Sequence, residues 1–258
     1  MTVSARDLAV LTRFSGRLFW RDRAAQSTSV GLFLGLGIGL PFLMDRLRPG
    51  RPDFVVDQHV GVLTMVLVLA TFGQITITLT ARRDQLLLKR MRATGLADRD
   101  ILGGEVANLV VQGTGLAAVV SVALYALTSL PVPRDPLLYL LAVVAGAAVL
   151  CLLGTAFTAA VPRAELAAVM SMPVFLLSGF GAGGFGPLLQ MAPEWVRAVF
   201  ELLPSSAVAE VARVAYAADG SLVGDLQAAA VPALKLAVWA AVGLAATARW
   251  FRWEIRRP

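Results

Sequence analysis

The chain has 258 residues, of which 57% are apolar and 16% charged, and its mean hydropathy is +0.73. A soluble domain contains about 45–50% apolar and about 25% charged residues. The apolar excess falls in blocks of about 20 residues, the length that crosses a bilayer as a helix. This pattern excludes a soluble enzyme. The net charge of +6 comes from arginines that flank the apolar blocks, which favours membrane topology over nucleic-acid binding as its explanation.

The first predicted element is an amphipathic helix over residues 4–23. Leucines and phenylalanines share one face of this helix, and arginines share the opposite face. An apolar stripe opposite arginines is typical of a helix that lies in the membrane interface. The alternative is a basic tail without helical structure that only follows the charge bias of membrane proteins.

Six apolar blocks predict six transmembrane helices. They cover residues 25–44, 59–80, 106–130, 137–161, 166–180 and 229–249. The segments on one side of these blocks hold 16 Lys and Arg residues, and those on the other side hold 6. Because basic residues concentrate on the cytoplasmic side, we expect both termini there, including the tail 250–258. The fold class is therefore an all-α integral membrane protein, a single transmembrane domain over 1–258.

Two connecting segments are more than plain loops. Residues 82–96 are too charged to span a membrane, and their helix formers predict a short amphipathic helix on the cytoplasmic face, closed by Thr94-Gly95. Residues 181–228 begin with a glycine-rich run, and three prolines divide the rest into pieces too short to span. We expect these pieces to form re-entrant or interfacial helices outside the bundle, between spans five and six.

The chain offers little chemistry of its own. It has no G-x-x-x-x-G-K-[ST] loop to hold the phosphates of ATP, and one His with one Cys cannot build a zinc site. Glu105 and Glu165 border cytoplasmic loops, where we expect a carboxylate to be solvated. Lys235, in the sixth span, is placed to reach the interface with its long side chain. A Ser178–His59 pair is the one conceivable catalytic dyad.

Two motifs resemble those of the type-2 ABC transporter permeases, which include antibiotic-resistance and polysaccharide-export subunits. The first is the family's E-R-E-x-G-T-L-K-R-L-R-A-T-P-L, which residues 82–96 match as RRDQLLLKRMRATGL. Here Leu86 stands at the glycine and Gly95 at the proline. The second is P-x-x-x-L-S-G followed by P-x-W and L-L-P, found as Pro173, Leu177-Ser178-Gly179, Pro193-Glu194-Trp195 and Leu202-Leu203-Pro204.

The resemblance implies that 82–96 is a coupling helix that docks into a separate ATPase subunit. The implied docking residues are Leu87, Leu88, Lys89, Arg90, Met91, Arg92, Ala93, Thr94 and Gly95. ATP and Mg would bind to that partner, with no cofactor on this chain. The permease would form a dimer with a second copy or a paralogue in a bacterial plasma membrane, in contact with lipid. The substrate would pass along spans two and five, with Gln74, Thr78, Phe175 and Phe180 as candidate contacts.

Two other classes of function stay open from the residues alone. An intramembrane enzyme, such as a protease or lipid transferase, would need a catalytic base or metal cluster that the sequence does not display. A non-transporting membrane scaffold or immunity protein would need no lever at 82–96. The six basic residues of the 82–104 region would then only bind anionic lipid headgroups.

The charge asymmetry predicts that Ser4 faces the cytoplasm. A cysteine placed at Ser4 in a Cys151→Ser background should react with a membrane-impermeant maleimide only after the cells are opened. Labelling of intact cells would place the N-terminus outside and contradict the predicted topology.

Overall fold

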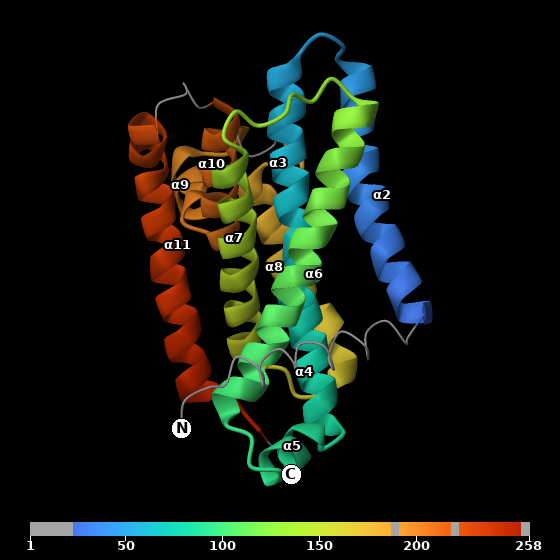
Figure 1. Cartoon of the computed structure of the whole chain (residues 1–258), viewed down its shortest axis with the longest axis vertical. Coiled ribbons are helices and arrows are strands. Elements are labelled where there is room, and N and C mark those ends of the chain that lie inside the picture. Colours follow the sequence, from blue (N-terminus) through green and yellow to red (C-terminus); the bar gives the residue numbers. More distant parts are fainter. Residues whose placement is uncertain (1–22, 187–190, 218–221, 254–258) are drawn as a thin grey trace.

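The computed structural model describes residues 23–186, 191–217 and 222–253, and these residues form helices and no strand. The helix expected over 4–23 lies, except for its last residue, outside the described part. The long helices run up and down along one axis, with a short helix at one end and two more at the other (Figure 1). In chain order the elements are α2 (Arg23–Leu47), α3 (Pro52–Val68), the π-helix η1 (Leu69–Gly73), α4 (Gln74–Asp84), α5 (Leu87–Ala93), α6 (Asp98–Leu127), α7 (Pro136–Phe157), α8 (Ala164–Ala182), α9 (Glu194–Glu201), α10 (Pro204–Ala217) and α11 (Leu222–Trp250).

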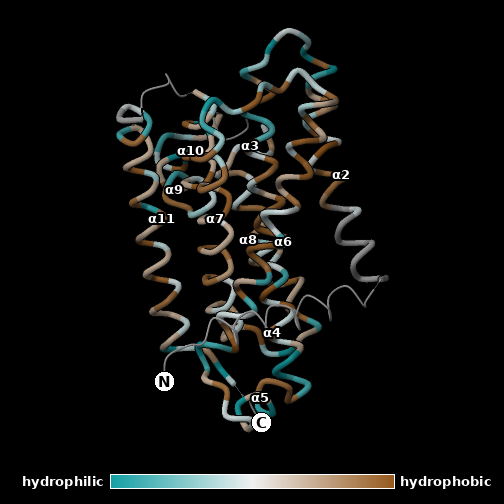
Figure 2. Tube along the Cα trace, in the orientation of Figure 1, coloured by the Kyte–Doolittle hydropathy of each residue, from teal (hydrophilic) through white to brown (hydrophobic). Residues whose placement is uncertain are grey.

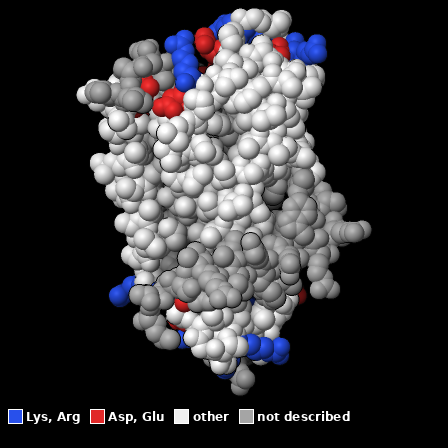
Figure 3. Space-filling model, viewed as in Figure 1, with Lys and Arg blue, Asp and Glu red and all other residues white. Residues whose placement is uncertain are grey.

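Within the described residues, five helical stretches are long and apolar enough to cross a membrane. They are Pro52–Asp84, Asp98–Leu127, Pro136–Phe157, Ala164–Ala182 and Gly224–Trp250. A band of apolar residues runs along their middle, and charged side chains gather at the two ends of the molecule (Figures 2 and 3). Five of the six expected spans are thereby found. The first expected block, 25–44, falls in α2, which packs beside α3 and α6.

The helices extend beyond the apolar blocks that predicted them. Span two begins at Pro52, seven residues before the expected start, because a proline at the first helical position and Asp53 in the first turn favour a helix start there. The sixth block was expected from residue 229, but α11 already begins at Leu222. Hydropathy finds the part of a helix that lies in hydrocarbon, and polar turns such as the one at Asp225 continue the helix beyond it.

Span two is the central helix of the bundle. Its most apolar window is 83% buried inside the protein, against 22–44% for the other four spans. At η1, this burial is possible because the neighbouring helices carry glycines there. A Cβ atom on Gly154 of α7 would lie 2.7 Å from the carbonyl oxygen of Phe72, and one on Gly113 of α6 would lie 2.9 Å from a Thr71 methyl group. The π-helix is therefore held between α6 and α7.

The glycine-rich exit of α8 also packs on span two. A Cβ atom on Gly61 would lie 2.5 Å from the carbonyl carbon of Gly183 and 2.6 Å from the nitrogen of Gly184. Gln58, one turn before Gly61, donates a hydrogen bond to the carbonyl oxygen of Gly184 (3.0 Å). The glycines at this point allow two backbones to touch, which places the ends of spans two and five side by side.

Gly61→Ala should destabilise the protein because the new methyl group meets backbone that cannot rotate away. We expect a loss of about 1–3 kcal/mol, typical of overpacking, measured as a lower midpoint of thermal unfolding in detergent. Gly115→Ala in span three is the matched control, since nothing lies within 4 Å of its Cβ position. Equal midpoints for the two variants would contradict the close backbone contact.

Candidate functional site

The cytoplasm-directed helix predicted over 82–96 is shorter than expected. The helix of span two continues to Asp84, and a separate helix, α5, covers only Leu87–Ala93. Leu86 separates them with a left-handed backbone (φ 58°), the only described non-glycine residue with positive φ. The predicted end of the helix is confirmed, because Gly95 has φ 85° directly after the Thr94 cap. The resembling family has a glycine at the position of Leu86, where this backbone costs nothing.

One fully buried leucine anchors α5 to the bundle. Leu88 has no exposed surface and belongs to a cluster with Ile75 and Leu79 of span two and Ile101 and Leu109 of α6. Of the other predicted docking residues, Leu87 and Met91 are half-buried, and the remaining six are exposed. Those six are Lys89, Arg90, Arg92, Ala93, Thr94 and Gly95. α5 thus has a basic exposed surface and is anchored to the bundle by an apolar buried side.

Arg92 contacts residues of this chain as well as facing outward. Its Nε atom lies 2.8 Å from a carboxylate oxygen of Asp98, and its guanidinium lies 4.8 Å from the ring centre of Trp253. These contacts connect α5 with the start of α6 and with the segment that follows α11. Arg92 therefore supports the position of α5, and the side chains of Lys89 and Arg90 beside it are exposed as well.

The last three residues of α4 connect span two to the helices around it. Arg82 forms a salt bridge with Glu105 of α6 (2.8 Å), and both side chains are at most 10% exposed. Arg83 donates hydrogen bonds to the carbonyl oxygens of Thr158 (3.1 Å) and Val161 (2.7 Å), which follow α7. Asp84 accepts a hydrogen bond from the first backbone N–H of α8, that of Ala164 (2.7 Å).

This clamp, formed by Arg82, Arg83 and Asp84, corrects one prediction. Glu105 was expected to be solvated, but it is 3% exposed and paired with Arg82. The pairing joins residues 23 positions apart in the sequence, so the local pattern did not reveal it. The clamp fixes the base of α5 to α6, to the end of α7 and to the start of α8.

The four residues suggested for the substrate pathway lie on spans two and five. Gln74 and Thr78 are half-buried on α4, directly after η1. Phe175 of α8 is half-buried against a cluster that includes residues of α3 and η1. Phe180 packs in an aromatic group with Phe185, at 4.8 Å between ring centres, and with Phe200 of α9. Phe180 therefore has a packing role at the end opposite α5.

A buried polar cluster gathers the only histidine and all three tyrosines of the chain. His59 of α3 bonds through Nε2 to the hydroxyl of Tyr139 of α7 (3.0 Å), which bonds to Ser121 of α6 (2.9 Å). The hydroxyls of Tyr125 and Tyr216 lie 3.1 Å apart beside them. His59 thus bonds to Tyr139 rather than forming the conceivable dyad with Ser178. The sequence shows these residues far apart, so only the packing of four helices reveals the cluster.

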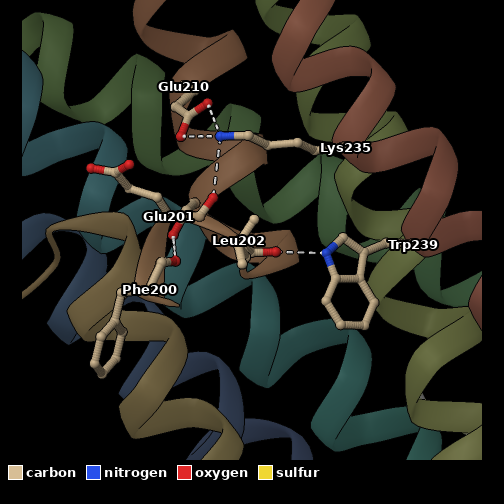
Figure 4. Close-up of polar contacts among 7 residues, drawn as sticks. Phe200, Glu201, Leu202, Glu210, Lys235 and Trp239 are labelled. Atoms are coloured by element: carbon tan, nitrogen blue, oxygen red, sulfur yellow. Dashed lines mark hydrogen bonds and ion pairs between the residues drawn. The ribbon is translucent and has the colours of Figure 1, made fainter. Parts of the chain in front are cut away.

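The end opposite α5 is closed by α9 and α10. Three consecutive carbonyl oxygens at the end of α9 each accept a hydrogen bond from a side chain (Figure 4). The carbonyl of Phe200 accepts from Ser206, that of Glu201 from Lys235 and that of Leu202 from Trp239. Lys235 of α11 also forms a salt bridge with Glu210 of α10 (3.0 Å). Its side chain, predicted to reach the interface, contacts α9 and α10 at this end of the molecule and joins these helices to the last span.

The profile of one protein family matches most of the chain. The ABC-2 type transporter family covers residues 6–216, from before α2 to the end of α10. The chain belongs to this family. No curated protein matches the sequence significantly. The match confirms the resemblance found in the motifs and identifies a multi-pass membrane protein, a permease subunit of an ABC transporter. Such subunits are generally not catalytic themselves, and they function with an ABC ATPase and usually as dimers.

Leu86→Gly should stabilise this ABC-2 permease. A left-handed backbone costs a residue with a Cβ atom about 1–2 kcal/mol, and the greater freedom of glycine in the unfolded chain offsets part of the gain. We expect a net increase of about 0.5–1 kcal/mol in the free energy of unfolding, read from the unfolding midpoint in detergent. Leu86→Ala is the control, because it removes the exposed side chain and keeps the strain. An increase of the same size in both variants would contradict the strained turn.

Proposed function

We propose that this permease exports a drug, a natural product or a lipid-like substrate from a bacterial cell, driven by a separate ATPase subunit. ATP and Mg²⁺ bind to that subunit. Its nucleotide-driven movement is received by α5, and no bond of the substrate is made or broken on this chain. The observation that carries the proposal is the construction of α5: an exposed basic surface, a fully buried Leu88 and a polar clamp at its base.

The proposed topology has six spans with α2 as the first and both termini in the cytoplasm. α2 has 25 residues, enough to cross a hydrocarbon layer, and it lies alongside α3 and α6. The connections then alternate, so that α5 and the link between α7 and α8 share one end while α9 and α10 share the other (Figure 1). The larger number of basic residues near α5 makes that end the cytoplasmic one.

The substrate would pass between two permease copies, along spans two and five. α8 is exposed on much of its surface, with Val169 at 67%, Met172 at 51% and Leu176 at 44%. These residues recur at helical spacing, so they form one apolar face that lipid or a second copy covers in the membrane. Half-buried Gln74 and Thr78 lie on α4, which packs against α8, and they are the candidate polar contacts of the substrate. A dimer across α8 would place two such faces opposite each other.

Charge reversal on α5 tests the coupling. In Lys89→Glu/Arg90→Glu, two acids replace exposed bases that the partner is expected to meet, and like-charge juxtaposition across an interface costs several kcal/mol. We expect the ATPase subunit to be lost from the purified complex and efflux to stop. Arg92 is left in place because it also contacts Asp98 and Trp253.

Arg99→Glu is a control for reversed charge at this end of the molecule, since Arg99 is an exposed arginine on α6. It should co-purify with the ATPase as the unchanged protein does. A binding site for anionic lipid alone predicts that both variants behave alike and that Lys89→Arg/Arg90→Lys changes nothing. Normal co-purification and normal efflux of the double reversal would refute docking through α5.

A further inference from the structure

A cavity lies at the end of the molecule opposite α5. Its volume is about 590 Å³, within the range of sites that hold drug-sized molecules. The walls come from the α2–α3 connection, from α3, from the glycine-rich exit of α8, and from α9 and α10. Spans two and five, which the proposed pathway follows, end at this cavity.

Four arginines line the cavity: Arg48, Arg51, Arg197 and Arg213. They are four of the six basic residues that the sequence places on this side of the membrane. Basic residues are depleted on the non-cytoplasmic side of membrane proteins, so topology does not account for their gathering. Charged side chains of both signs are visible at this end of the molecule (Figure 3).

Two of the acidic residues in the cavity wall are already neutralised. Asp57 pairs with Arg213 at 2.9 Å, and Glu210 pairs with Lys235 of α11 at 3.0 Å. Glu201 remains, and its carboxylate points away from Lys235 in Figure 4. Among the described residues, no ion pair involves Arg48, Arg51 or Arg197. The cavity therefore has three arginines that are not in ion pairs against one carboxylate.

Two of the cavity arginines, Arg48 and Arg213, are held in place by contacts within the chain. The guanidinium of Arg48 lies 4.7 Å from the ring centre of Phe54, a cation–π contact. Arg213 also donates a hydrogen bond to the carbonyl oxygen of Ala182 (2.8 Å). Arginine presents paired N–H groups that fit the two oxygens of a carboxylate or phosphate.

We propose that this cavity binds an oxyanion group, a phosphate or a carboxylate, of a drug-sized molecule or of a lipid headgroup. Arg51 contacts the anion from the α2–α3 connection and Arg197 contacts it from α9, while Arg48 adds to the positive potential. That the site receives the exported substrate at the exit of the pathway rests on the proposed function. The binding of the oxyanion itself does not.

The test measures binding on the full chain without an ATPase subunit, so it is independent of whether α5 couples transport. Inorganic pyrophosphate is titrated at constant ionic strength, and the rise of the unfolding midpoint gives an apparent Kd. In parallel, native mass spectrometry compares retention of phosphatidylglycerol and phosphatidylcholine. In Arg51→Ala/Arg197→Ala, loss of charge-assisted contacts should weaken binding by about tenfold or more. Arg46→Ala/Arg134→Ala, at the same end but outside the cavity wall, should bind as the unchanged chain does.

Each outcome decides the proposal. Pyrophosphate binding that is lost in the cavity variant supports a site for a free or substrate-borne anion. Selective retention of phosphatidylglycerol that is lost in the same variant supports a lipid headgroup as the source. Binding of neither probe, or equal weakening in both double variants, overturns the site. Because both arginines are exposed, unchanged helix content and elution volume of the variant will separate lost binding from misfolding.

Discussion

The guanidinium of Arg83 donates to the carbonyl oxygens of Thr158 and Val161 in the connection between α7 and α8. The neighbouring Asp84 accepts the first backbone N–H of α8, which has no partner within its own helix. Helix ends carry such unpaired groups wherever they occur, and leaving them buried without partners is costly. Here one turn of span two supplies both kinds of partner, and Arg82 adds the buried pair with Glu105. The position of α5, and therefore any use of it as a lever, depends on this arrangement, because α5 has only seven residues and one fully buried side chain of its own.

Span two is held in place along the rest of its length by close packing against glycines. The middle of span two is packed by Gly113 and Gly154, and its upper part by the backbone of Gly183 and Gly184. In a bilayer, helices gain little from hiding apolar surface, so close van der Waals packing through small residues carries more of the association. A π-helix in the centre of such a rod widens it by one residue per turn, and the small neighbours accommodate that widening. Dense packing in the middle and polar clamping at one end together make span two a stiff element.

The sequence predicted well those features that depend on local composition. Hydropathy located the helices of spans two to six because each must match the thickness of hydrocarbon, and Gly95 marked the end of α5 because few other residues adopt its backbone. It did not predict the pairing of Glu105, since a carboxylate beside a charged loop has the same local pattern whether solvated or paired. The sequence also predicted one continuous helix through Leu86, because the identity of a leucine does not indicate that its backbone is left-handed. The cavity arginines were counted for topology only, since their convergence depends on three separate segments.

The cluster around His59 has a practical consequence. All aromatic hydroxyls and the single imidazole of the protein sit where α3, α6, α7 and α10 meet. An isotope-labelled histidine or tyrosine would therefore give spectroscopic signals from one place alone, without any engineered label. α10 reaches the cluster from the end that carries α9, and the other three helices cross the apolar band. Those signals would therefore report how α9 and α10 move relative to the spans. The protein therefore contains a built-in spectroscopic reporter where α10 meets the spans.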